Sequence, residues 1–180
     1  IVIKEIIEAH FMKKEQSISV RELYIGIGSN LHDPKKQVSK AIQKLSKQDE
    51  FNDVKVSKFY ESEPMGPQDQ GNYVNCVVRL KSGATPEDIL LLLKGIESMM
   101  GREKSPVKWS ERIIDLDIIL YGDLVYQSET LTIPHKDVAD RAFVLQPLID
   151  IDPEIFIPQK GYARDLIKSC LYKNIKKIEK

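Results

Sequence analysis

The stretch RIIDLDIILYG, residues 112–122, limits the fold more than any other part of the chain. Its period-2 pattern predicts a strand in which Asp115 and Asp117 share one face, about 7 Å apart. The opposite face carries the apolar residues Ile114, Leu116, Ile118 and Leu120. A buried carboxylate without a partner costs several kcal/mol or takes up a proton. The strand is therefore expected to lie in a sheet with one apolar face and one polar face.

The rest of the chain alternates between strand and helix patterns. Period-2 alternation predicts the strands 22–30, 53–62, 73–82 and 113–122. Helical spacing predicts the helices 33–47, 85–101 and 163–178. The first two helices open with a capping residue followed by proline, as in Asp33-Pro34. The order βαββαβ predicts an α+β protein with a ferredoxin-like core, an antiparallel sheet with helices on one face, and a C-terminal extension.

The polar face of this sheet is expected to hold a site rather than a second core. Tyr73 and Asn75 lie opposite the apolar residues of their strand, and Gly26 and Gly28 leave their own face bare. Together with the two acids, this face offers an aromatic ring, an amide and free space over glycines.

Length and charge limit the classes of function. The 180 residues suit one domain with or without an appendage, and 27 basic residues balance 27 acidic ones. Net charge therefore gives no reason to expect nucleic acid or membrane partners. The two cysteines, Cys76 and Cys170, lie far apart in no metal-binding spacing, which is typical of a reduced, cytoplasmic protein.

Two carboxylates spaced in this way can bind one or two hard cations, with phosphate oxygens completing the coordination. The alternative is a pair of solvent-facing acids, or acids paired with Lys108 and Arg112. Nearby cations favour a polyphosphate ligand. They are Arg102, Lys104, Lys108, Arg112, His135, Lys136 and Arg141.

From about Leu23 to Pro158 the chain resembles the 6-hydroxymethyl-7,8-dihydropterin pyrophosphokinases of folate synthesis. The resemblance rests on several separated motifs in order: GIGSNL, FYES, GPQDQGNYVN, IESMMGR, RIIDLDIILYG and TIPHKDVADRAFVLQPL. It implies transfer of pyrophosphate from ATP to the hydroxymethyl group of a dihydropterin, with release of AMP. It also implies that Asp115 and Asp117 hold two Mg²⁺ ions and that Arg102 and Arg112 take part in catalysis.

The resemblance further implies contacts to both substrates. The pterin is expected to be stacked and hydrogen-bonded by Ser62, Pro64, Met65, Tyr73, Asn75 and Phe143. ATP is expected to contact Glu97, Lys104, Trp109, Arg112, Ile118, Thr132, His135 and Arg141. Five positions depart from forms common in the family, namely Glu63, Lys94, Lys104, Thr130 and Lys136. A lysine supplies charge without arginine's bidentate fork. The five changes are expected to affect nucleotide affinity and loop closure rather than the reaction.

Residues 1–22 are expected to be an appendage or linker, and residues 23–180 the catalytic domain. The start at Ile1 fits a fragment of a fusion with another folate-pathway enzyme, and it fits a cloning remnant equally well.

Two other functions compete with this one. A nucleotidyltransferase also uses two acids in D-x-D, but its Gly-Ser pair lies shortly before them, whereas Gly28-Ser29 lies far upstream. A non-catalytic RNA-binding sheet would carry aromatic residues and a basic surface.

Overall fold

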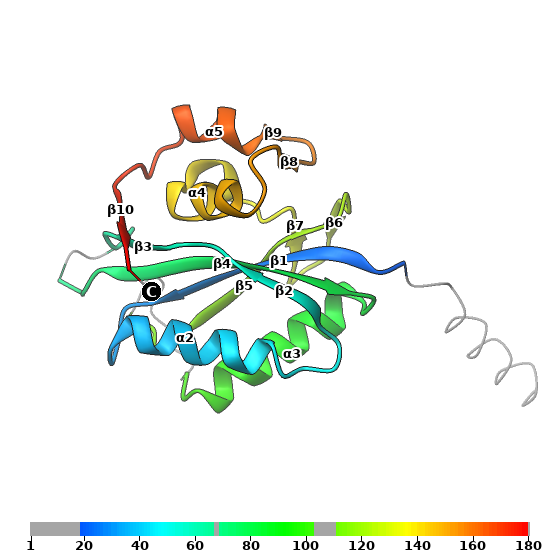
Figure 1. Cartoon of the computed structure of the whole chain (residues 1–180), viewed down its shortest axis with the longest axis horizontal. Helices are drawn as coiled ribbons and strands as arrows, with labels where there is room; N and C mark the ends of the chain where they lie inside the picture. Colours follow the sequence, from blue (N-terminus) through cyan, green and yellow to red (C-terminus); the bar gives the residue numbers. More distant parts are fainter. Residues whose placement is uncertain (1–18, 67–68, 103–110, 180) are drawn as a thin grey trace, which may run out of the picture.

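The chain forms an antiparallel sheet between two helical layers (Figure 1). The computed structural model describes residues 19–66, 69–102 and 111–179. The strands of the large sheet are β1 (Arg21–Ser29), β2 (Asn52–Val56), β3 (Phe59–Ser62), β4 (Tyr73–Ser82), β5 (Asp115–Tyr121) and β10 (Ile175–Ile178). The helices are α2 (Pro34–Leu45), α3 (Pro86–Met99), η1 (Val138–Asp140), α4 (Ala142–Ile151) and α5 (Ala163–Ser169). Two small hairpins pair β6 (Tyr126–Gln127) with β7 (Thr132–Ile133) and β8 (Phe156–Ile157) with β9 (Gly161–Tyr162).

The sheet confirms the predicted α+β, ferredoxin-like core. Its order is β10-β3-β4-β1-β5, and β2 also pairs with β4. β1 lies between β4 and β5, so that Gly28 is opposite Asn75 on one side and Asp115 on the other. The register therefore brings the predicted amide and one predicted acid to the two sides of the same glycine.

The first core lies between the sheet and the layer formed by α2 and α3. Leu23 and Ile25 of β1 and Leu93 of α3 are fully buried in it. Each helix begins at the predicted cap, because the side chain of Asp33 accepts a hydrogen bond from Lys36 N and that of Thr85 from Asp88 N. Helices α2 and α3 thus cover one face of the large sheet, as predicted.

The opposite face of the sheet is divided between a second core and the polar residues. Val77 and Leu120 pack there against α4, which contributes Leu145 and Leu148. The polar residues lie on this face as predicted, but the prediction that it holds no second core was wrong. The C-terminal extension supplies this layer, and its helices lie above the sheet in Figure 1.

A bulge in β5 explains why Leu120 lies on the second core rather than on the predicted first one. Tyr24 pairs with Leu120 and Ile25 with Ile118, which leaves Ile119 as an extra residue. The extra residue reverses the alternation, so Leu120 faces α4 and Tyr121 faces the first core.

Two predicted elements are different in the structure. The strand predicted at 53–62 is interrupted, because the Ser57 side chain accepts the hydrogen bond of Val77 N and separates β2 from β3. The helix predicted at 163–178 ends at Ser169, and residues 175–178 form β10 on the edge of β3. Pairing with an open sheet edge has overridden the helical spacing there.

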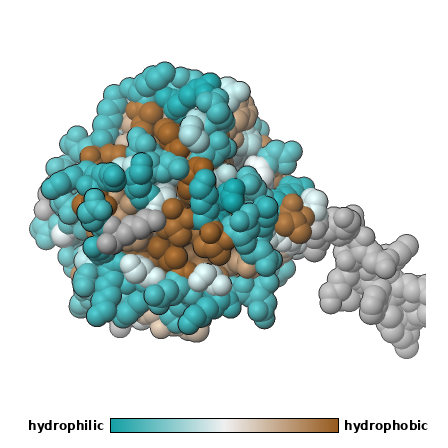
Figure 2. All heavy atoms as spheres, viewed as in Figure 1, coloured by the Kyte–Doolittle hydropathy of each residue, from teal (hydrophilic) through white to brown (hydrophobic). Residues whose placement is uncertain are grey.

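The surface is mainly hydrophilic on the face that Figure 2 shows, and hydrophobic residues gather in its middle, between the two helical layers. In this view the sheet, which is covered on both faces, is seen from its edge. Among the residues that the structure describes, no helix has the length and apolar character that a membrane span needs.

Tyr121→Phe is expected to lower the free energy of unfolding by about 1–2 kcal/mol. The buried Tyr121 hydroxyl lies 2.9 Å from the carbonyl oxygen of Ser82 and 2.8 Å from that of Ala84, and donates its hydrogen to them. Chemical denaturation measures the loss. Tyr126→Phe is the control, because the Tyr126 hydroxyl makes no hydrogen bond to any described residue. Equal losses in the two variants would contradict the role given to the Tyr121 hydroxyl.

Candidate active site

Asp115 and Asp117 lie on the same face of β5, as the period-2 pattern predicts. They are opposite Gly28 and Gly26 of β1, and both line a cavity of about 510 Å³. A side chain at either glycine would be crowded, because a Cβ atom at Gly28 would lie 3.2 Å from Oδ1 of Asn75 and one at Gly26 would lie 3.0 Å from Cδ1 of Ile119. The two glycines thus let Asn75 and Ile119 lie close to β1 at the floor of the cavity.

This larger cavity collects most of the residues predicted to bind the pterin. They are Ser62, Met65, Tyr73, Asn75 and Phe143, which come from β3, the loop after it, β4 and α4. The Asn75 amide nitrogen donates to Ser62 Oγ at 2.9 Å, which fixes the direction of the amide. Pro64 is buried and does not line the cavity.

A smaller cavity of about 260 Å³ collects residues predicted to bind ATP, including Ile118, Thr132 and His135. Lys94 and Thr130, two of the positions that depart from the family pattern, also line it. The two cavities share Asp117, His135 and Lys136. The site is therefore one polar junction between two chambers.

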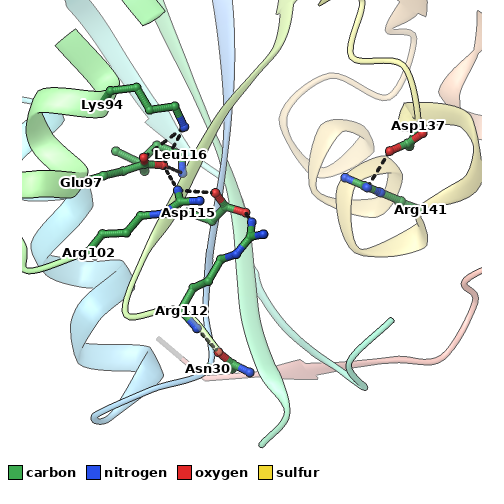
Figure 3. Close-up of polar contacts among 9 residues, drawn as sticks. All are labelled: Asn30, Lys94, Glu97, Arg102, Arg112, Asp115, Leu116, Asp137 and Arg141. Atoms are coloured by element: carbon green, nitrogen blue, oxygen red, sulfur yellow. Dashed lines mark hydrogen bonds and ion pairs between the residues drawn. The ribbon is translucent and has the colours of Figure 1, made fainter. Parts of the chain in front are cut away.

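Asp115 is held by two arginines (Figure 3). Arg102 donates to its Oδ1 at 2.6 Å and Arg112 to its Oδ2 at 2.7 Å. Burial acts to raise the pKa of Asp115, but the two guanidinium charges outweigh it and the pKa is lowered. Asp115 is therefore ionised at neutral pH.

Asp117 has a different environment although it is only two residues away. No ion pair to its carboxylate is found within residues 19–66, 69–102 and 111–179. Burial and then the charge of Asp115 raise the pKa of Asp117 to about 6. The second acid is thus a poorly compensated charge that a cation would stabilise.

Glu97 lies beneath these residues and is 3% exposed. Its carboxylate accepts hydrogen bonds from Lys94 Nζ at 3.0 Å, from Leu116 N at 2.7 Å and from the Arg102 guanidinium. It lines neither cavity, and Figure 3 shows Arg102 between Glu97 and Asp115. The structure thus gives Glu97 the position of a support for Arg102, and its predicted contact with ATP remains a prediction.

His135 is oriented by the backbone at the junction of the cavities. Asp137 N donates to His135 Nδ1 at 3.2 Å, so Nε2 carries the proton of the neutral ring. Burial, and next the charge of Arg141, lower the pKa of His135 to about 4. Arg141 is held by Asp137 at 2.7 Å on the far side of the site in Figure 3. A neutral hydrogen-bond donor and a fixed cation thus stand side by side.

The GIGSN motif has a supporting role in the described residues. Ser29 Oγ donates to Ile113 O at 2.7 Å, and Asn30 Oδ1 accepts from Arg112 N at 2.8 Å. These bonds hold the segment that leads into β5.

Some site residues were missed, and some predictions concern residues outside the structure. Leu171 and Tyr172 line the larger cavity, but the predicted C-terminal helix gave no sign of this. Lys104 and Trp109 lie outside the described residues, so their contacts with ATP remain predictions.

Comparison with known proteins adds the identity of the family. Residues 24–153 match the family model described as 7,8-dihydro-6-hydroxymethylpterin-pyrophosphokinase (HPPK). The chain is 41% identical over 145 residues to the 2-amino-4-hydroxy-6-hydroxymethyldihydropteridine pyrophosphokinase of Haemophilus influenzae, covering 81% of this chain and 90% of that protein. It is 39% identical to the folic acid synthesis protein fol1 of Schizosaccharomyces pombe, over 82% of this chain and 20% of that much longer protein.

A solved structure agrees in fold. The HPPK-DHPS triple mutant of Plasmodium falciparum superposes with a TM-score of 0.70 at 16% identity, covering 91% of this chain and 49% of that one. These findings place the chain among the transferases that move a pyrophosphate group. It belongs to the 7,8-dihydro-6-hydroxymethylpterin-pyrophosphokinase family, and its reaction is a step of folate biosynthesis with ATP as co-substrate.

Asp117→Asn is expected to raise the free energy of unfolding by about 1–2 kcal/mol at pH 7.5 in metal-free buffer. The folded-state pKa of about 6 lies above the unfolded value of 3.8, so the charged carboxylate destabilises the fold above pH 6. The gain should disappear as the pH falls from about 6 to 4. Denaturation curves with EDTA at several pH values measure it.

Asp115→Asn is the matched comparison and should have the opposite effect at pH 7.5. It removes the counter-charge of Arg102 and Arg112 and should cost about 1–2 kcal/mol. Stabilisation by both substitutions, or by neither, would contradict the electrostatic difference between the two acids.

Proposed function

We propose that the larger cavity binds 6-hydroxymethyl-7,8-dihydropterin, that the smaller one binds ATP, and that pyrophosphate is transferred where they meet. The observation that carries this proposal is the junction itself, since Asp117, His135 and Lys136 line both cavities. A reaction between two substrates requires the acceptor and the donor phosphate to meet at a charged, partly enclosed point.

On the pterin side, Tyr73 and Phe143 supply rings for stacking on a flat heterocycle. The Asn75 nitrogen is already bonded to Ser62, and its oxygen receives no hydrogen bond from the described residues, so it can accept one from the ring. The backbone of residues 62–65 is proposed to contact the pterin edge. A ring with a different pattern would leave these buried groups unpaired, which gives selectivity.

On the nucleotide side, apolar and charged residues are separated in a way that suits ATP. Ile118 and Leu131 can contact the base, while Lys94 and Lys136 add positive charge for the phosphates. His135 lines both cavities, and Arg141 lines the larger one, from which it is proposed to reach the phosphates. Lys104 and Trp109 are proposed to complete the site from a segment that the structure does not describe.

Asp115 and Asp117 are the residues that would hold Mg²⁺. The poorly compensated charge of Asp117 fits a bound cation. In the part of the chain that the structure describes, no cluster of three or more acidic, histidine or cysteine side chains forms a complete metal site, so phosphate oxygens and water would supply the remaining ligands. Bound Mg²⁺ would offset charge on the β-phosphate during in-line attack.

Arg102 and Arg112, which both form ion pairs with Asp115, are proposed to stabilise the phosphates of ATP. Each can turn a part of its guanidinium group toward a phosphate, because Asp115 and Glu97 fix the position of Arg102 and Asp115 fixes that of Arg112. The acceptor hydroxyl oxygen then attacks the β-phosphorus, the bond from the β-phosphorus to the α,β-bridging oxygen breaks, and AMP leaves. The chain thus acts mainly by positioning and electrostatics.

The remaining proposals concern cellular context. The fol1 protein of Schizosaccharomyces pombe and HPPK-DHPS of Plasmodium falciparum both extend far beyond the part that this chain matches. We propose that this chain also works beside another folate-pathway enzyme, fused to it or associated with it. A cytoplasmic location would supply its ATP.

Chromatography of the nucleotide products tests the proposed reaction. The purified protein with ATP, Mg²⁺ and 6-hydroxymethyl-7,8-dihydropterin should form AMP and the pterin diphosphate in equal amounts. Formation of ADP would indicate simple kinase chemistry. Free pyrophosphate with a nucleotidylated product would favour the nucleotidyltransferase, and tight salt-sensitive binding of RNA without turnover would favour the RNA-binding sheet.

Asp115→Asn and Asp117→Asn should each reduce turnover by about 10²-fold or more, because several kcal/mol of transition-state stabilisation depend on the metals. Calorimetry with an ATP analogue carrying an α,β-methylene bridge should show weaker Mg²⁺-dependent binding in both variants. Asp123→Asn is the control, since the Asp123 side chain is 97% exposed. Unchanged Mg²⁺ dependence in both site variants would exclude the proposed metal ligands.

A further inference from the structure

The chain has a C-terminal strap, residues 170–178, which joins the layer of α4 and α5 to the edge of the sheet (Figure 1). In the figure it descends from the end of α5 to β10 beside β3. The strap lies beyond residue 153, where the match to the family model ends.

One end of the strap is fixed to the wall of the larger cavity. Tyr172 N donates to Asp140 O at 2.9 Å, and Ala142 N donates to Tyr172 O at 3.0 Å. No side chain of the described residues caps α4, so the Tyr172 carbonyl satisfies a backbone group at the beginning of this helix. The strap therefore holds the start of α4, next to Arg141 and Phe143.

The other end of the strap is fixed to the opposite wall. β10 pairs with β3, with Ile175 opposite Ser62 and Ile178 opposite Phe59. Ile175 packs against the second core and Ile178 against the first. The strap thus has anchors on both sides of the cavity.

Directly before the first anchor, the side chain of Leu171 has little contact with the protein. Its neighbour Cys170 is 2% exposed in the second core, and the extended backbone at Cys170 turns the next side chain the other way. Leu171 is 74% exposed, yet it lines the larger cavity together with Phe143. Its apolar surface contributes almost nothing to the core and is available to a ligand.

We propose that Leu171 is a binding residue for the pterin substrate, held at the cavity rim by the strap, and that it sets the affinity for that substrate. The proposal rests on the proposed function, which places the pterin in this cavity. A bound ring that covers part of the leucine side chain removes apolar surface from water on both partners. Loss of this contact should weaken pterin binding by about three- to tenfold and leave the chemistry unchanged.

Steady-state kinetics of AMP formation test the proposal. Leu171→Ala should raise the KM for 6-hydroxymethyl-7,8-dihydropterin about three- to tenfold at saturating ATP and Mg²⁺, with kcat and the KM for ATP unchanged. Leu171→Met retains apolar surface and should restore most of the affinity. The unfolding free energy should be the same in all variants, because Leu171 is exposed.

Leu91→Ala is the matched control. Leu91 is a leucine of α3 with 73% exposure that lines neither cavity, and its replacement should change no kinetic constant. An unchanged pterin KM in Leu171→Ala would overturn the inference while leaving the reaction intact. A rise in the KM for both substrates, in step with lost stability, would also overturn it, since that is a structural effect.

Failure of the proposed function gives a different result. In that case the unsubstituted protein forms no AMP, and calorimetry detects no binding of the dihydropterin in the presence of the α,β-methylene analogue of ATP. That outcome overturns both proposals together.

Discussion

The need to keep two carboxylates on a sheet that is covered on both faces determines much of this structure. Asp115 is balanced by Arg102 and Arg112, and Glu97 in turn balances Arg102 from below. Asp117 has no such balance among the described residues. Such an imbalance lowers stability, and it is the observation behind the proposal that a bound cation compensates Asp117.

The same constraint explains why one face of the sheet is shared between packing and chemistry. The bulge at Ile119 turns two successive residues of β5 toward α4, and the second core begins there. Before the bulge, both acids face the larger cavity, and Asp117 also lines the smaller one. A single extra residue thus separates a packed half of the face from a polar half, and the packed half fixes the strands that carry the acids.

The sequence was sufficient for features that depend on local alternation. The period-2 pattern correctly placed Asp115 and Asp117 together, and it placed Tyr73 and Asn75 on the same face. It failed at Leu120, because a bulge changes the alternation without a sequence signal. The resemblance to the family supplied the reaction, while the roles of individual residues remain predictions.

Non-local pairing was the main element that the sequence did not reveal. The helical spacing of residues 163–178 was overridden because β3 offered an unpaired edge to β10. The second core was missed for a related reason, since α4 can be recognised as a covering layer only once the sheet beneath it is known. The role proposed for Leu171 depends on both of these features, so no local pattern could have indicated it.

The position of the strap also affects how the protein is made. The first core is formed mainly by elements up to β5, and Ile133 of β7 and Ile178 of β10 are added later, so its helices and central strands can begin to assemble while the ribosome is still adding the later residues. The larger cavity, in contrast, receives Leu171 and its second anchor only when residues 170–178 have emerged. On the role proposed for Leu171, a nascent chain can therefore be largely folded before it gains its full affinity for the pterin.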